Sequence, residues 1–144
     1  MTTPEDSHGR RLPGADRLVV SGIEAIGHHG VFDFERREGQ VFVVDLVLGL
    51  DTREAARSDD LRDTVDYGTL VMRVKEAIET DPVDLIETLA QRIADLCLTD
   101  PRVEWTEVTV HKPGAPVQAA FGDIALTVTR SQQPTGPLDI GAQT

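Results

Sequence analysis

The sequence predicts an α+β domain in which an antiparallel sheet carries two helices on one face. Stretches with alternating apolar residues lie in pairs at the two ends of the core, and two amphipathic helical stretches separate them. The element order is therefore ββααββ. Helices grouped between two hairpins pack on one side of an antiparallel sheet. The length of 144 residues suits one domain.

The first pair of strands is predicted from alternation that changes phase once. Leu18 and Val20 alternate, and the phase then shifts across Ser21 and Gly22, as a β-bulge would produce. A loop with the sequence GHHGVFDFERREG follows. The next strand, residues 40–50, has one strongly apolar face, formed by Phe42, Val44, Leu46, Leu48 and Leu50. Its other face, formed by Val41, Val43, Asp45 and Val47, is too apolar to be fully exposed to solvent. We therefore expect another protein surface to cover it.

Two helices and a second strand pair complete the core. The first helix has one apolar stripe: Tyr67, Leu70, Val71, Val74 and Ile78. Asp66 suits its N-cap. The second helix has a similar stripe: Leu85, Ile86, Leu89, Ile93 and Leu96. Strands are expected over residues 103–111 and 123–130.

The ends of the chain differ in composition from this core. Residues 1–15 and 131–144 lack periodicity and are rich in Pro, Gly, Ser, Thr and Gln, so we expect two flexible tails around a domain of residues 16–130. No stretch resembles a signal peptide or a membrane span, which favours a cytoplasmic protein.

Charge and cysteine content exclude several functions. The net charge is -11, which argues against binding nucleic acid or an anionic membrane surface. A single cysteine, Cys97, excludes an intramolecular disulfide, and its helical spacing indicates a core thiol.

Four short stretches contain residues that suit chemistry. The first, GHHGVFDFE, contains His28, His29 and Glu35. Neighbouring histidines suggest a metal, but in a strand they point to opposite faces, and zinc needs further ligands that this chain hardly offers. We expect no metal site here and a loop shaped by the flanking glycines.

The second and third stretches each allow two interpretations. In DTVDYGTL, Tyr67 is either the first core residue of its helix or a site residue. In VDLIETLAQRIA, Asp84 and Glu87 have the spacing of a capping box. Alternatively, the Glu87 carboxylate faces a pocket beside the start of the helix.

The fourth stretch, HKPGAP, places Lys112 at a strand end beside the stiff residues Pro113 and Pro116. The chain has only two lysines among its 14 basic residues. The pKa of a lysine is tuned by burial, whereas arginine keeps its proton, so this choice hints at proton transfer. The alternative is an exposed loop lysine.

In their order and spacing, these stretches resemble the dihydroneopterin aldolase family of folate biosynthesis. The resemblance covers about residues 16–130. It rests on a Gly-His-Gly loop followed by an acid (Gly27, His29, Gly30, Glu35), Asp-Thr-Val-x-Tyr-Gly (63–68), Leu-Ile-Glu (85–87) and Lys-Pro-x-x-Pro (112–116).

The resemblance implies the tunnelling fold, in which ββααββ subunits join side by side into barrels, usually as a homo-octamer of two stacked tetramers. It also implies active sites between subunits, with Tyr67 contributed by a neighbour. The family reaction cleaves 7,8-dihydroneopterin into 6-hydroxymethyl-7,8-dihydropterin and glycolaldehyde. Because the ring C=N bond of the substrate is the electron sink, no cofactor, metal or lysine Schiff base is expected.

The resemblance also implies roles for single residues. Lys112 would manage the proton of the 2′-hydroxyl through water, and Tyr67 would assist protonation of the enol-like intermediate. Glu35 would lie near the side-chain hydroxyls and an ordered water. Glu87 would accept hydrogen bonds from the ring amino group and N3–H. Further pocket residues would be Thr64, Val65, Leu85 and Ile86.

Three alternatives stay open at this stage. A dihydroneopterin triphosphate epimerase needs a basic cluster, and only Arg36 and Arg37 offer one, through assembly. Epimerisation at C2′ is also conceivable as a side activity of an aldolase. A non-catalytic pterin-binding barrel and a zinc-dependent pterin enzyme of the same fold are the other two.

Overall fold

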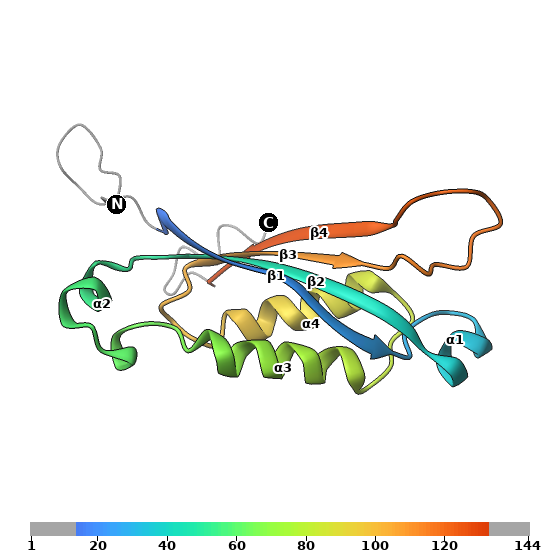
Figure 1. Cartoon of the computed structure of the whole chain (residues 1–144), viewed down its shortest axis with the longest axis horizontal. Coiled ribbons are helices and arrows are strands. Elements are labelled where there is room, and N and C mark those ends of the chain that lie inside the picture. The colour runs from blue at the N-terminus through green and yellow to red at the C-terminus, as the bar shows by residue number, and fades with distance from the viewer. Residues whose placement is uncertain (1–13, 133–144) are drawn as a thin grey trace, which may run out of the picture.

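The computed structural model describes residues 14–132, and within them the predicted α+β architecture is confirmed (Figure 1). These residues form a four-stranded antiparallel sheet of order β1-β2-β3-β4. Its strands are β1 (Asp16–Gly27), β2 (Gln40–Leu50), β3 (Trp105–His111) and β4 (Ala125–Ser131). The predicted tails lie outside the described residues, except for positions 14, 15, 131 and 132.

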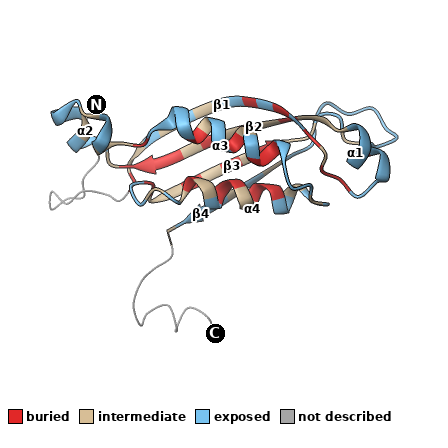
Figure 2. Ribbon diagram, turned by 90° about the horizontal axis from the view of Figure 1, so that it is seen from below, coloured by how far each residue is buried: buried red, intermediate tan, exposed pale blue. Residues whose placement is uncertain are grey.

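Two long helices, α3 (Tyr67–Glu79) and α4 (Ile86–Cys97), lie on the same face of the sheet (Figures 1 and 2). Their stripes meet the inner faces of β2 and β3, where Phe42, Leu46 and Val108 are fully buried. Asp66 caps α3 as predicted, because its Oδ1 accepts the N–H of Thr69 at 3.2 Å. No helix in residues 14–132 is long and apolar enough to cross a membrane.

The predicted bulge in β1 is present. Val20 pairs with Leu46, and Ile23 pairs with Val44. The two β1 residues between these pairs therefore have no paired residue on β2. Gly22 has a φ of 74°, which a glycine adopts without strain, and its N–H donates to Asp45 Oδ1 at 2.8 Å. The bulge therefore places the Gly22 N–H within hydrogen-bond distance of the Asp45 carboxylate, on the outer face of the sheet.

Cys97 is buried as expected for a core thiol. Burial raises its pKa to about 11, so it stays a neutral thiol at physiological pH.

Two short helices were not predicted, α1 (Asp33–Glu38) and α2 (Arg53–Ser58). A 3-10 turn, η1 (Leu61–Asp63), lies before α3, where Asp59, Asp60 and Asp63 predict a loop or short turn. Six residues are too few to show a helical stripe. The expectation that residues 33–38 belong to a loop was wrong.

The capping-box interpretation of Asp84 and Glu87 is also wrong. The N-cap of α4 is Leu85, and no side chain caps this helix. Asp84 instead accepts a hydrogen bond from Arg36 Nη2 at 2.5 Å.

Candidate active site

A pocket of about 280 Å³ lies where α1, the start of α4 and the loop after β3 meet. Five of the eight predicted site residues line it: Glu35, Leu85, Ile86, Glu87 and Lys112. The Val31, Val117 and Ile124 side chains add apolar walls. The pocket therefore combines an apolar interior with a few charged groups, as small-molecule sites do.

At the base of this pocket, Lys112 and Glu35 form an ion pair. Lys112 Nζ lies 2.7 Å from Glu35 Oε2, with 13% of the lysine side chain and 1% of the glutamate side chain exposed. Glu35 Oε2 also accepts from Gln40 Nε2 at 2.9 Å, and its Oε1 accepts the Phe32 N–H at 3.2 Å. The carboxylate thus has partners on both oxygens.

These partners decide the charge of Glu35. Burial raises the pKa of this carboxyl, but hydrogen bonds from Lys112, Gln40 and the Phe32 backbone outweigh burial and leave the pKa below 4.5. Glu35 is therefore ionised at neutral pH.

The absence of a side chain at Gly30 provides the space that the Glu35 carboxylate occupies. Its φ is 151°, and a Cβ at this position would lie 2.2 Å from Glu35 Oε1. Any larger residue would displace the carboxylate. The glycine of the predicted Gly-His-Gly loop thus has a steric role in the site.

His29 holds this loop from the core side. Its Nε2–H donates to the Ile78 carbonyl at 2.7 Å, and its Nδ1 accepts the Val83 N–H at 3.0 Å. Burial lowers its pKa, so the ring is neutral with the proton on Nε2. His28 bonds the Arg36 carbonyl instead. Neither histidine lines the pocket, and within residues 14–132 no group of three or more His, Cys, Asp or Glu side chains is arranged to hold a metal ion.

Arg36 joins α1 to the segment that precedes α4. Its Nε donates to the Gly30 carbonyl at 3.0 Å, and its Nη2 pairs with Asp84. The Gly30 N–H also donates to the Val83 carbonyl at 2.9 Å. These bonds bring Glu35 of α1 and Glu87 of α4 to one pocket.

Tyr67, Thr64 and Val65 do not meet Lys112 within one chain. Tyr67 begins α3 and is 59% exposed, whereas Ile78, near the other end of α3, bonds His29 beside the pocket. Eleven residues of helix separate these ends by about 16 Å. Val65 is buried in the core at 4% exposure.

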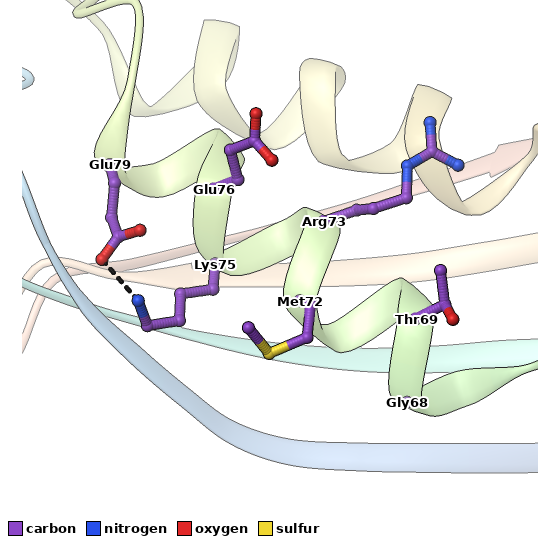
Figure 3. Close-up of a pocket in the computed structure, with 7 residues that line it drawn as sticks. All are labelled: Gly68, Thr69, Met72, Arg73, Lys75, Glu76 and Glu79. Carbon is purple, nitrogen blue, oxygen red and sulfur yellow. Dashed lines mark hydrogen bonds and ion pairs between the residues drawn. The ribbon is translucent and has the colours of Figure 1, made fainter.

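A second hollow, of about 520 Å³, lies along the outer side of α3 (Figure 3). All of its lining residues come from this one helix, and its only drawn ion pair is Lys75–Glu79 at 2.7 Å. An i,i+4 pair on an exposed helix is a surface feature. The hollow lacks groups that converge from separate elements, so the chemistry belongs to the smaller pocket.

Sequence reasoning missed Gln40 and the Asp84–Arg36 pair. Gln40 is in phase with the buried face of β2 that begins at Phe42, and a polar residue in that phase was the available signal. Its Oε1 is buried and accepts no hydrogen bond from the described residues. Gln40 therefore keeps an acceptor beside the ion pair.

This arrangement defines a class of protein: an α+β subunit with a buried lysine–carboxylate pair at the base of a small-molecule pocket. The family model described as dihydroneopterin aldolase matches residues 18–129. The chain belongs to the dihydroneopterin aldolase family, as the resemblance predicted.

Individual relatives agree with this assignment. Dihydroneopterin aldolase of Streptomyces coelicolor is 53% identical over 117 residues, covering 81% of this chain and 98% of that protein. The Bacillus subtilis enzyme is 40% identical over 118 residues, with 81% and 98% covered. The structure of Escherichia coli dihydroneopterin aldolase in complex with neopterin is 28% identical, with a TM-score of 0.73 and coverage of 81% and 99%.

Proposed function

We propose that the chain is a 7,8-dihydroneopterin aldolase, a lyase that releases glycolaldehyde and leaves 6-hydroxymethyl-7,8-dihydropterin. The observation that carries this proposal is the buried Lys112–Glu35 pair at the base of a pocket with Glu87 in its lining. Family membership and a relative that binds neopterin support the substrate class.

The cleaved bond joins C1′ and C2′ of the substrate side chain. The 2′-hydroxyl loses its proton, its oxygen becomes the aldehyde of glycolaldehyde, and the bonding electrons enter the ring C=N bond. Protonation at C1′ then completes the hydroxymethyl product. Because the ring accepts the electrons, this route requires neither a metal nor a lysine Schiff base.

Lys112 and Glu35 supply the proton transfer at the 2′-hydroxyl. A protonated amine cannot act as a base, so Lys112 passes a proton to Glu35 along their 2.7 Å hydrogen bond and takes the 2′-hydroxyl proton through a water. The low exposure of both side chains keeps bulk water from competing. Lys112 is the proton-transfer group and Glu35 orients it beside the side-chain hydroxyls.

Glu87 holds the pterin ring. An aminopyrimidinone edge presents two parallel donors, the amino group and N3–H, and a carboxylate accepts both in a charge-assisted arrangement. Glu87 lies in the first turn of α4, where the nearby backbone N–H groups favour a negative charge. The apolar walls formed by Leu85, Val117 and Ile124 suit the flat ring.

Tyr67 comes from a neighbouring subunit in this proposal. It lies at the end of α3 remote from Lys112, and more than half of its side chain is exposed in the single chain. Thr64 precedes it in the same segment, and Val65 supports that segment from the core. A homo-octamer built from barrels of this sheet would bring the two parts of the site together and would cover the outer face of β2.

Two observations disfavour the triphosphate epimerase. Arg36, which a phosphate would need, is engaged by Asp84 and by the Gly30 carbonyl. Glu35, Asp84 and Glu87 also give the pocket an excess of negative charge. Epimerisation of dihydroneopterin at C2′ remains part of the proposal as a side activity. It requires only that the enol-like intermediate adds to the opposite face of the glycolaldehyde carbonyl, which needs no new residue.

Product analysis with dihydroneopterin and its triphosphate, each with a chelator, tests these functions. We expect glycolaldehyde and the hydroxymethyl pterin from dihydroneopterin alone, with a minor C2′ epimer. Binding without turnover would indicate a non-catalytic pterin protein, and loss of turnover with the chelator would indicate a zinc enzyme.

The cytoplasmic location stays a prediction.

A further inference from the structure

On the outer face of the sheet, His111 is hydrogen-bonded to a carboxylate on each side. Its Nδ1 lies 2.7 Å from Asp123 Oδ2, and its Nε2 lies 2.7 Å from Asp45 Oδ2. An ionised carboxylate only accepts hydrogen bonds, and a neutral imidazole has one donor. Both bonds therefore exist together only when the ring is protonated. We call Asp45, His111 and Asp123 the His111 clamp.

The charges within the clamp favour that protonated ring. Hydrogen bonds to Asp123 and then to Asp45 raise the pKa of His111 above 6.5, although partial burial opposes them. The Gly22 N–H at the bulge of β1 is the main reason that the pKa of Asp45 is lowered, so Asp45 is ionised.

The other residues on this face of the sheet near His111 are also acidic or uncharged. Strand register places Glu24 of β1 on the same face, two strands away, and Glu107 lies four residues earlier on β3. The β4 partner of His111 is Ala125. Lys112, the next residue, pairs with Glu35 in the pocket instead.

The clamp closes the loop that forms one wall of the pocket. The Lys112 N–H donates to the Ile124 carbonyl at 2.7 Å, and the His111–Asp123 bond lies directly beside this rung. Between these ends, the loop supplies Pro116 and Val117 to the pocket. Asp45 connects the closed loop to β2, an inner strand of the sheet that also contains Gln40, whose side chain bonds Glu35.

We propose that His111 is a positioning residue, which holds Lys112 against Glu35 by clamping both ends of the 112–124 loop to β2 while its ring is protonated. Loss of the proton removes one of the two donors and leaves a carboxylate facing a ring lone pair. The loop end then loosens, and Lys112 moves relative to Glu35. The activity readout rests on the proposed aldolase function.

Two clamp variants and one control test this inference. His111→Gln keeps one donor without charge, and Asp123→Asn leaves the Asp45 bond in place. Glu107→Gln removes a negative charge from the same face of β3 outside the clamp. For each protein, single-turnover cleavage of dihydroneopterin is measured from pH 6 to pH 9, with substrate affinity and Tm.

We expect His111→Gln to lower the rate about 10- to 100-fold, the loss that a small misplacement of a catalytic group causes, with little change in affinity. The rate of the wild-type enzyme should fall as the pH rises above the pKa of His111. This fall should be absent in His111→Gln, and in Asp123→Asn it should begin at a lower pH. Glu107→Gln should match the wild type. A lower Tm with the wild-type rate and pH profile would overturn the proposal.

A second measurement does not depend on turnover. Lys75→Arg leaves Lys112 as the only lysine of the chain. In this background, the NMR signal of Lys112 Cε should shift with pH as His111 titrates, and adding His111→Gln should abolish that shift. The shift would support the clamp even if the protein cleaved no dihydroneopterin, and its absence would refute the clamp. If His111→Gln does not fold, Asp123→Asn decides by the same readouts.

Discussion

Lys112 Nζ and Glu35 Oε2 lie 2.7 Å apart in a place where the glutamate is almost completely buried. The lysine directly follows strand β3, and the carboxylate belongs to α1. A charge that is paired in this way costs much less to bury than a single one. The same two residues therefore stabilise the pocket and carry out the proposed proton transfer.

Lys112→Arg should be almost as inactive as Lys112→Ala. Arginine keeps the positive charge but cannot release a proton near neutral pH, and its planar head would displace the relaying water. General acid–base catalysis contributes about 10²- to 10⁴-fold, so we expect kcat to fall by this factor in both variants with little change in substrate binding. Single-turnover cleavage and equilibrium binding check this. Near-normal turnover of the arginine variant would limit Lys112 to an electrostatic role.

Glu35→Gln should reduce both activity and stability at neutral pH. The lysine is left without its countercharge, and breaking a buried pair costs about 3 kcal/mol. The Glu35 pKa lies below its ordinary value of 4.5, so its ionised form stabilises the fold above pH 4.5, and this contribution is lost as pH falls through the folded pKa. The wild-type advantage should therefore shrink in acid.

Urea unfolding at matched protein concentration, at pH 7 and below pH 4.5, measures this difference. The control is Glu38→Gln, an exposed glutamate on the same helix α1. A stability difference that is equal at both pH values would show that the Glu35 charge does not stabilise the fold.

Glu87→Gln should weaken substrate binding without destabilising the protein. Glutamine offers one acceptor and one donor to two ring donors, so we expect a loss on the order of 2–3 kcal/mol in binding. Tm should change little, because Glu87 caps no backbone N–H and an exposed charge in the first turn of a helix contributes only about 0.3–1 kcal/mol. Titration calorimetry and thermal melting check this, with Glu76→Gln on α3 as the control. Normal binding with a lower Tm would make Glu87 a structural residue.

A lysine on the outer face of β2 should separate the subunits. Val43 and Val47 are only half-buried in the single chain, and Val43→Lys or Val47→Lys would place a charge in the proposed barrel interface. Light scattering should show smaller species, and activity should fall in parallel. Ala56→Lys, on the exposed surface of α2, adds the same charge as a control. Full assembly and activity of both valine variants would contradict the proposed interface.

The sequence predicted those parts of the fold that depend on a repeated local pattern. The alternation in residues 40–50 located β2 with its bounds, and the stripe that starts at Tyr67 located α3. Both regular patterns extend over many residues. By contrast, α1 is short, and its position depends on Arg36 contacts with residues far along the chain.

The same distinction applies to the site. Glu35, Glu87 and Lys112 were predicted through motif order, but the bond between Glu35 and Lys112 arises only when β2, β3 and α1 are packed together. The His111 clamp needs the strand register as well, because Asp45, His111 and Asp123 come from three separate segments. Such contacts depend on tertiary structure, and local propensity does not encode them.

Mixing two inactive variants should restore activity if Tyr67 and Lys112 act from different chains. Tyr67→Phe and Lys112→Ala each remove one residue from every site in a pure oligomer. After equal amounts are dissociated and reassembled together, random assortment gives both native residues to about a quarter of the sites. Turnover should recover toward that fraction of the wild-type rate. Mixing without dissociation is the control and should recover nothing. If reassembled hybrids are verified by mass spectrometry and stay inactive, Tyr67 and Lys112 do not form one site across a subunit interface.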